Sequence, residues 1–305
     1  MATKSAAGSL LGIESLELNT INQLLDAAYR MQRKRPRPLL KEKRVALLFY
    51  ESSTRTRVSF EYAAKVLGAT TTLVSATASS IEKGESLIDT GYTLMALGAQ
   101  AIIIRHPSSG APHLLSRYVD VPVINAGDGL HEHPSQALLD AYTILRHKKT
   151  LKGLRVALIG DIFHSRVARS NIHLLTKAGA HVALCGPPEL VPDVAMTLAN
   201  DVSITRDLRE AVTGADVVIA LRIQKERLAG LQLSLDEYIA NYQLTAERVA
   251  WAKKDAIVMH PGPIIRGLEL TADVADAQRT VIVEQVQNGV AVRMAILARA
   301  LGVKH

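Results

Sequence analysis

Cysteine is nearly absent from this sequence of 305 residues, because Cys185 is the only one. A single cysteine excludes an intrachain disulfide and fits a reducing compartment. Cys185 ends an aliphatic run, so we interpret it as a core residue. No apolar run reaches the roughly 18 residues that a membrane helix needs, and the amino-terminal residues lack the apolar stretch of a signal peptide. We therefore expect a cytoplasmic protein that does not bind membranes.

Aromatic residues are also scarce, at 4% of the chain, whereas hydrophobic residues make up 48%. The core must therefore be aliphatic. The chain is long enough for two domains, at roughly 150 residues each. Its formal net charge of +7 suits nucleic acid, an anionic membrane or small anionic substrates.

The densest basic stretch runs from Arg30 to Arg44. It lacks the aromatic residues and glycines that are usually interleaved with the charges of a nucleic-acid patch. We interpret it as a solvated loop, and we expect no nucleic-acid partner. A non-enzymatic nucleic-acid binder that uses this stretch stays as the alternative from a different functional class.

Short apolar runs alternate with longer helical patterns along most of the chain. The runs predict strands at Val45–Tyr50, Thr71–Ser75, Ala101–Arg105, Val121–Asn125, Arg155–Ile159, His181–Cys185, Val202–Thr205, Val217–Leu221 and Ile257–His260. The patterns between them predict helices at Val58–Leu67, Leu87–Leu97, Pro134–Arg146 and Val167–Lys177. This alternation predicts an α/β fold with two doubly wound domains built on parallel sheets.

The boundary between the two domains is expected near residue 146, where a helical pattern ends in a polar stretch. We predict a first domain over residues 1–146 and a second over residues 147–283. The last helix, about Glu284–Leu301, is amphipathic. We expect the segment 284–305 to pack back on the first domain, and the active site to lie in the cleft between the two domains.

Polar side chains follow many of the predicted strands at their carboxyl ends, which is where open α/β sheets bind ligands. These groups lie at residues 51–57, 105–106, 131–136, 161–166, 222–224 and 260–263. One such group could arise by chance. Their repetition at the predicted edge indicates a binding site.

The segment Ser53-Thr54-Arg55-Thr56-Arg57 lies between a predicted strand and a predicted helix. Hydroxyls at a helix start cap its free amides, and those amides attract an anion. Arg55 adds a bidentate fork for phosphate oxygens. The segment lacks the glycines and the lysine of a P-loop, so we expect a small phosphorylated substrate rather than a nucleoside triphosphate.

Two further groups follow later strands of the first domain. Arg105 places a guanidinium at the end of one predicted strand, where it could serve the site. The alternative is that it forms an ordinary structural ion pair. His133 and Gln136 are three residues apart at the start of a helix, where one turn can aim both at the same point. The neighbours His131 and Glu132 form only a weak metal pattern, and we expect no metal.

The second predicted domain carries arginines at its strand ends. Gly160-Asp161 does not continue as Gly-x-Gly-x-x-Gly, which disfavours a dinucleotide. Arg166 and Arg222 could hold a second anionic group, such as carboxylates, and Gln224 faces the same side as Arg222. Surface ion pairing is the alternative for both arginines. Lys83 lies in a predicted loop before a helix, and from the residues alone we interpret its side chain as solvated.

Together, these segments resemble the aspartate and ornithine carbamoyltransferases over nearly the whole chain. The resemblance rests on Phe49-Tyr-Glu-Ser-Ser-Thr-Arg-Thr-Arg57, Lys83-Gly-Glu-Ser86, Arg105-His-Pro107, His133-Pro-Ser-Gln136, Arg222-Ile-Gln-Lys-Glu-Arg227 and His260-Pro-Gly-Pro263. The last two segments favour the aspartate branch, because the ornithine branch typically has His-Cys-Leu-Pro at the final position. One departure is Ile265, which stands where many relatives have asparagine.

The resemblance implies an enzyme that joins carbamoyl phosphate and L-aspartate in pyrimidine biosynthesis, without a cofactor or a metal. It implies that the phosphate is bound by Ser53, Thr54, Arg55 and Thr56. The carbonyl oxygen is then contacted by Thr56, Arg105 and His133, and the carbamoyl amide by Gln136. Backbone groups at Gly262 and Pro263 also contact carbamoyl phosphate. It implies that Arg166, Arg222 and Gln224 bind aspartate. Arg57 has no assigned contact and is interpreted as support for its loop.

The resemblance also implies a homotrimer. Ser79 and Lys83 then belong to a loop that reaches the neighbouring subunit's site, where Lys83 also contacts aspartate. Further assembly with dihydroorotase or with regulatory chains stays open, as does regulation by nucleotides. A transcarbamoylase for another amine acceptor is the alternative within the same enzyme class.

Overall fold

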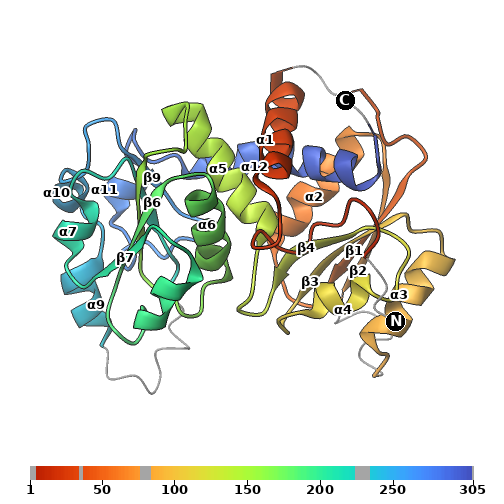
Figure 1. Ribbon diagram of the computed structural model, residues 1–305, viewed down its shortest axis with the longest axis horizontal. Coiled ribbons are helices and arrows are strands. Elements are labelled where there is room, and N and C mark those ends of the chain that lie inside the picture. The colour runs from red at the N-terminus through yellow and green to blue at the C-terminus, as the bar shows by residue number, and fades with distance from the viewer. Residues whose placement is uncertain (1–4, 34–36, 76–83, 224–233, 304–305) are drawn as a thin grey trace. The chain divides into compact units, whose positions relative to one another are not determined.

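The computed structural model describes residues 5–33, 37–75, 84–223 and 234–303 (Figure 1). The chain divides into two compact units. Unit 1 comprises Met1–Tyr142 and Val286–His305, and unit 2 comprises Thr143–Gln285. The divisions fall within two helices, α5 (Pro134–Lys148) and α12 (Ile282–Ala300).

Unit 1 contains a four-stranded parallel sheet in the order β2-β1-β3-β4. Its strands are β1 (Arg44–Phe49), β2 (Thr70–Ser75), β3 (Ala101–His106) and β4 (Val123–Asp128). The inner strands are almost wholly apolar because both of their faces are buried. On one face, Leu48, Ile102 and Ile104 form a cluster with Leu94 and Leu115.

The helices of unit 1 are α1 (Leu18–Arg33), α2 (Thr54–Val66), α3 (Leu87–Ala96) and α4 (Ala111–Ser116), together with the first part of α5 and most of α12. Helix α2 contacts β1 and β2, and α4 contacts β3 and β4. Helix α12 lies beside α1, where the Gln32 amide donates to Asn288 Oδ1 at 2.8 Å (Figure 1).

Unit 2 contains a five-stranded parallel sheet in the order β7-β6-β5-β8-β9. Its strands are β5 (Arg155–Ile159), β6 (His181–Cys185), β7 (Val202–Thr205), β8 (Val217–Ala220) and β9 (Ile257–Met259). Its helices are α6 (Arg166–Lys177), the 3₁₀ helix η3 (Asp193–Leu198), α7 (Leu208–Val212), α9 (Leu235–Tyr242), α10 (Ala246–Val249) and α11 (Ala272–Ala275). Cys185 is fully buried, and burial raises the pKa of its thiol to about 12, as befits a core residue.

Every strand predicted from the sequence is present, and the two parallel sheets confirm the predicted fold class. The largest shift is in β4, which begins at Val123 and continues to Asp128. The interpretation of Arg30–Arg44 as one loop was wrong at both ends. Arg30 and Arg33 lie in the last turn of α1, and Arg44 opens β1.

No helix in the described ranges is both long enough and apolar enough to cross a membrane.

Candidate active site

The segment after β1 turns directly into α2, as the sequence predicts. Ser53 is the N-cap residue and has extended backbone angles, with φ −159° and ψ 94°. Among the described residues, its hydroxyl makes no capping hydrogen bond to the helix. The expectation that this hydroxyl caps a helix amide was therefore wrong. Thr54 and Arg55 are exposed in the first turn, whereas Thr56 is buried.

A pocket of about 360 Å³ opens beside this turn. It is lined by Phe49, Tyr50, Glu51, Ser52, Ser53, Thr54, Arg57, Leu73 and Ser75. Of the predicted phosphate ligands, Ser53 and Thr54 line it, and Arg55 and Thr56 do not. Arg57 does line it, although we expected Arg57 only to support its loop.

Arg105 lies at the end of β3, next to the end of β1. Its Nε is 3.3 Å from Glu51 Oε2, and its guanidinium also donates to the Ala126 carbonyl at 3.4 Å. The ion pair that we considered as the alternative for Arg105 is therefore present. Because Glu51 lines the pocket, this pair connects the end of β3 to it.

His133 ends the loop between β4 and α5, and Pro134 is the first residue of the helix. The His133 carbonyl accepts hydrogen bonds from the amides of Gln136 and Ala137, at 2.9 and 3.2 Å. Its imidazole is buried, with Nδ1 3.5 Å from the Ser135 hydroxyl. The backbone of His133 thus begins the helix, while its ring is held inside the unit.

Gln136 is oriented by a partner that the sequence did not reveal. Its Nε2 donates to Asp140 Oδ1 at 2.9 Å, one turn further along α5. Asp140 is fully buried and faces the positive charge of Arg293 on α12. Burial lowers the pKa of Arg293 to about 10, although the negative charge of Asp140 opposes this shift. The Arg293 guanidinium also lies 5.0 Å from the centroid of the Phe60 ring.

Glu132 anchors the loop that carries His133. Its side chain is 2% exposed, and its carboxylate accepts hydrogen bonds from the Ile13 amide at 2.8 and 2.9 Å and from the Glu14 amide at 3.1 Å. A buried carboxylate that accepts several amides is a strong structural link. The loop is thereby fixed to the amino-terminal segment.

In unit 2, the turn after β5 leads into α6. Ser165 caps this helix by accepting from the Ala168 amide at 3.1 Å, and Arg166 is its first residue. Asp161 Oδ1 accepts from the His164 amide at 2.9 Å. Arg166 is half-buried at the helix start.

Arg222 follows β8 and is also half-buried. Its Nε is buried and has no hydrogen-bond partner within the described part of the chain. The buried Glu269 braces this strand end, since it accepts from the Ile223 amide at 3.0 Å and from the Ile265 amide at 2.9 Å. Burial raises the pKa of Glu269, and these amides and the Arg222 charge oppose that rise.

The segment after β9 is held by local hydrogen bonds. The Gly262 amide donates to His260 Nδ1 at 2.7 Å, and the His260 amide donates to Gln285 Oε1 at 3.0 Å. The Gly262–Pro263 peptide bond is cis. Ile265 packs against the core of unit 2, so apolar packing occupies the position where many relatives have asparagine.

The candidate residues gather at one edge within each unit. In unit 1 they follow β1, β3 and β4, which are neighbours, and in unit 2 they follow the neighbours β5, β8 and β9. Ser79, Lys83 and Gln224 lie outside the described residues. The Gln136–Asp140 hydrogen bond and the charge of Arg293 beside Asp140 were not anticipated, because α5 and α12 are far apart in the sequence.

Two family models match the chain. Residues 9–146 match the carbamoyl-phosphate-binding domain of the aspartate/ornithine carbamoyltransferases, and residues 152–300 match their aspartate/ornithine-binding domain.

Two relatives are each described as an aspartate carbamoyltransferase catalytic subunit. The protein from Koribacter versatilis is 64% identical over 293 residues, which cover 96% of this chain and 97% of the relative. The protein from Solibacter usitatus is 52% identical over 298 residues, which cover 96% and 99%.

Solved structures show the same fold. Ornithine carbamoyltransferase from Pyrococcus furiosus matches with a TM-score of 0.89 and 30% identity, covering 99% of this chain and 100% of the other. Aspartate transcarbamoylase from Trypanosoma cruzi, in complex with carbamoyl aspartate and phosphate, matches with a TM-score of 0.87 and 33% identity, covering 98% and 97%.

Proposed function

The chain belongs to the aspartate/ornithine carbamoyltransferase family, and we propose that it transfers the carbamoyl group of carbamoyl phosphate to the amine of L-aspartate. The products are N-carbamoyl-L-aspartate and phosphate. The choice of aspartate rests on the relative that is 64% identical over 96% of the chain.

The reaction moves negative charge in a defined order. The aspartate nitrogen attacks the carbonyl carbon, charge builds on the carbonyl oxygen, and the bond from carbon to the phosphate oxygen then breaks. The departing phosphate takes the proton that the amine loses. No covalent intermediate with the protein is required, so the protein acts by holding the substrates in line and by stabilising charge.

Unit 1 is proposed to bind carbamoyl phosphate. The hydroxyls of Ser53 and Thr54 and the guanidinium of Arg55 hold the phosphate, aided by the amides at the start of α2. Thr56, Arg105 and His133 donate to the carbonyl oxygen, where each donor contributes a factor of about 10² to 10³ in rate by analogy with oxyanion holes.

Gln136 is proposed to select the carbamoyl amide. Because its Nε2 donates to Asp140, its Oε1 is the atom that accepts from the substrate NH₂ group. Asp140 and Arg293 act as positioning residues, since they fix the amide without touching the substrate. Backbone groups at Gly262 and Pro263 complete the carbamoyl contacts.

Unit 2 is proposed to bind aspartate through Arg166, Arg222 and Gln224. Guanidinium groups match carboxylates in geometry and charge, and the buried Nε of Arg222 supports this assignment. The formal net charge of +7 suits two anionic substrates. The proposed pathway is pyrimidine biosynthesis, and the proposed location is the cytoplasm.

An acceptor assay tests the activity. The purified chain receives carbamoyl phosphate with aspartate, ornithine or other amines, and the carbamoylated products are measured. We expect turnover with aspartate and none with ornithine. Turnover with another amine but not with aspartate would contradict the proposal.

The assembly is proposed to be a homotrimer in which Ser79 and Lys83 act in the neighbouring subunit's site. Inactive Arg55→Ala chains and inactive Lys83→Gln chains are mixed and allowed to exchange. Reassorted trimers should regain part of the activity, because some sites then contain neither substitution. Confirmed subunit exchange without any recovery would count against a shared site.

A further inference from the structure

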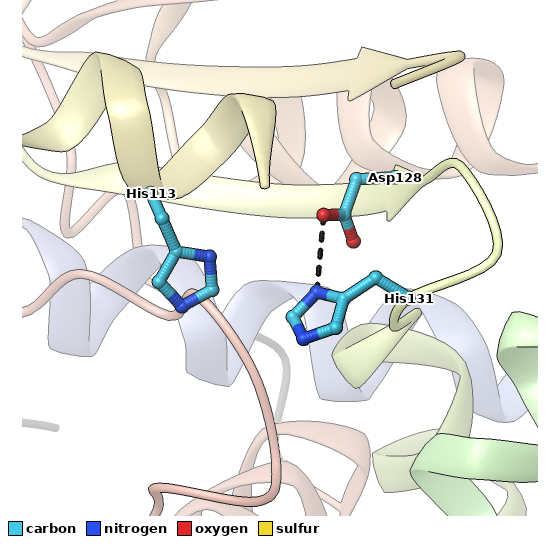
Figure 2. Close-up of side chains that lie close together, drawn as sticks. All are labelled: His113, Asp128 and His131. Carbon is cyan, nitrogen blue, oxygen red and sulfur yellow. Dashed lines mark hydrogen bonds and ion pairs between the residues drawn. The ribbon is translucent and has the colours of Figure 1, made fainter. Parts of the chain in front are cut away.

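Two histidines and a carboxylate meet beside the β4–α5 loop (Figure 2). His113 comes from α4, Asp128 is the last residue of β4, and His131 follows three residues later. Each offers a ligand atom, and these atoms all lie within 4.8 Å of one another. The sequence drew attention only to His131 and Glu132, because nothing in the sequence order marks His113 as a neighbour.

The spacing of this cluster is close to that of metal ligands. His131 Nδ1 lies 3.1 Å from Asp128 Oδ2, whereas two ligands of a tetrahedral zinc with bonds of about 2.0–2.1 Å lie roughly 3.3 Å apart. The rings of His113 and His131 are edge to face, with centroids 5.5 Å apart. Figure 2 shows the three side chains near one another, with His113 on α4 and with His131 bonded to Asp128.

The carboxylate is already held in place. Asp128 is fully buried, and its oxygens accept from the Gly110 amide at 2.7 Å, the Asn125 side chain at 2.8 Å and the Glu132 amide at 3.1 Å. Such outer contacts orient metal ligands in proteins. Burial raises the pKa of Asp128, but hydrogen bonds from His131, Asn125 and Gly110 outweigh it and leave the pKa below its ordinary value.

The two histidines have the partial exposure that metal entry requires, since each is only half-buried. Burial, with the adjacent His131, lowers the pKa of His113 and favours the neutral imidazole that binds metals. Two imidazoles and one carboxylate suit zinc and similar transition ions rather than Mg²⁺ or Ca²⁺.

We propose that His113, Asp128 and His131 form a site for Zn²⁺ or a similar divalent transition ion, with water at the remaining coordination position. The ion would join α4 to the loop that precedes His133. The site is separate from the substrate contacts proposed above, and its test does not depend on catalysis.

Titration of the untagged full chain with Zn²⁺, in competition with a chromophoric chelator, measures this site directly. We expect one ion per chain, and at least tenfold weaker binding in His113→Ala and in His131→Asn. Even the loss of an outer partner weakens metal sites by about 10–100-fold. In His131→Asn, the new amide can keep the hydrogen bond to Asp128 while the imidazole is lost, so folding should be preserved.

A matched control exists in unit 2. Asp161 and His164 have the same sequence spacing, and His164 Nδ1 lies 3.1 Å from Asp161 Oδ2, but the described residues place no second histidine in a three-ligand group with them. His164→Ala should therefore bind Zn²⁺ as the wild type does. Undetectable binding by the wild type, or equal binding by all variants, would overturn the proposal.

Ligand replacement adds a spectroscopic test. In His113→Cys, a thiolate takes the imidazole's place, so bound Co²⁺ should gain a sulfur-to-cobalt charge-transfer band that the wild type lacks. Cys185 is fully buried, with its pKa raised to about 12, and should not contribute. A His113→Cys protein that binds Co²⁺ without this band would place the ion elsewhere and refute the site.

Discussion

The two units carry different side chains at the same structural position, the carboxyl edge of a parallel sheet. In unit 1, the side chains proposed to contact the reacting carbamoyl group, Thr56, His133 and Gln136, are buried. In unit 2, Arg166 and Arg222 are long and half-buried. Buried donors fix the point at which a developing charge is stabilised, whereas arginines capture an anion that is already charged. We therefore expect substitutions of these buried residues in unit 1 to lower kcat, and substitutions of the arginines in unit 2 to raise KM for aspartate.

The largest effect is expected for His133→Ala. Removing one donor to the carbonyl oxygen should lower kcat by about 10² to 10³, with a small change in KM for aspartate. Steady-state kinetics with both substrates check this. His181→Ala, on the exposed side of unit 2 and 3.6 Å from Asp201, is the control and should retain wild-type kinetics. A normal kcat in His133→Ala would contradict the proposed role of the buried donors of unit 1.

A smaller effect is expected for Arg222→Ala. Losing a charged hydrogen bond, at about 1.5–3 kcal/mol, should raise KM for aspartate roughly 10–100-fold. The affinity for carbamoyl phosphate, measured by calorimetry, should stay unchanged. The matched control is Arg33→Ala, an exposed arginine in α1, which should change neither constant. Weaker carbamoyl phosphate binding by Arg222→Ala would show that Arg222 does not act on aspartate alone, contrary to the role proposed for unit 2.

Asp140→Leu, which removes the acceptor of the Gln136 hydrogen bond, separates the positioning of Gln136 from the stability of unit 1. It leaves the buried Arg293 without its counter-charge, which costs about 3–5 kcal/mol of unfolding free energy. Adding Arg293→Met should restore much of that stability, as measured by urea unfolding. The carbamoyl-facing oxygen of Gln136 is still not fixed, so kcat should stay low, by up to about 10²-fold, because misplacement of a positioning group by about 1 Å can cost that much.

Full recovery of kcat in the stable double variant would show that Asp140 acts only on stability.

The smallest effect concerns pH. The hydrogen bond to Asp128 raises the pKa of His131, so its contribution to stability is fully present below pH 6.5 and is lost as pH rises through the folded pKa. Asp128 has a lowered pKa, so its contribution is lost only as pH falls below about 3.8. Between these limits both contributions are present.

Urea unfolding with EDTA at pH 6 and pH 8 measures this contribution. The wild type should lose stability between the two values relative to His131→Asn. Parallel pH dependence of the two proteins would show that the His131–Asp128 pair adds nothing.

The strands were predictable because buried parallel strands appear as apolar runs bounded by polar turns. β5 and β6 have the predicted bounds, and β8 and β9 end one residue early. Helix α1 was missed because a basic run in its last turn resembled a loop. Short helices such as α10 and α11 lack the length that a helical period requires.

Candidate site residues could be predicted from the sequence only where the residues that could act together are also neighbours along the chain. Ser53–Arg57 forms one continuous segment, so a phosphate-binding role could be proposed from local residues. Asp140, Arg293 and His113 depend on packing between separate helices and loops, which a single sequence does not encode in any local pattern. Within the described ranges, the Ser53 hydroxyl makes no capping hydrogen bond, and this detail of geometry is visible only in the structure.

Binding of N-(phosphonacetyl)-L-aspartate tests whether the chain binds both substrates in one site, since this molecule carries the phosphate-like group and both carboxylates. A Trypanosoma cruzi aspartate transcarbamoylase structure contains this compound. We predict tight binding to the wild type, weaker binding to both Arg55→Ala and Arg222→Ala, and weaker binding of carbamoyl phosphate to Arg55→Ala alone. The proposed function would be wrong if the mimic bound no more tightly than inorganic phosphate, or if Arg222→Ala bound it as the wild type does.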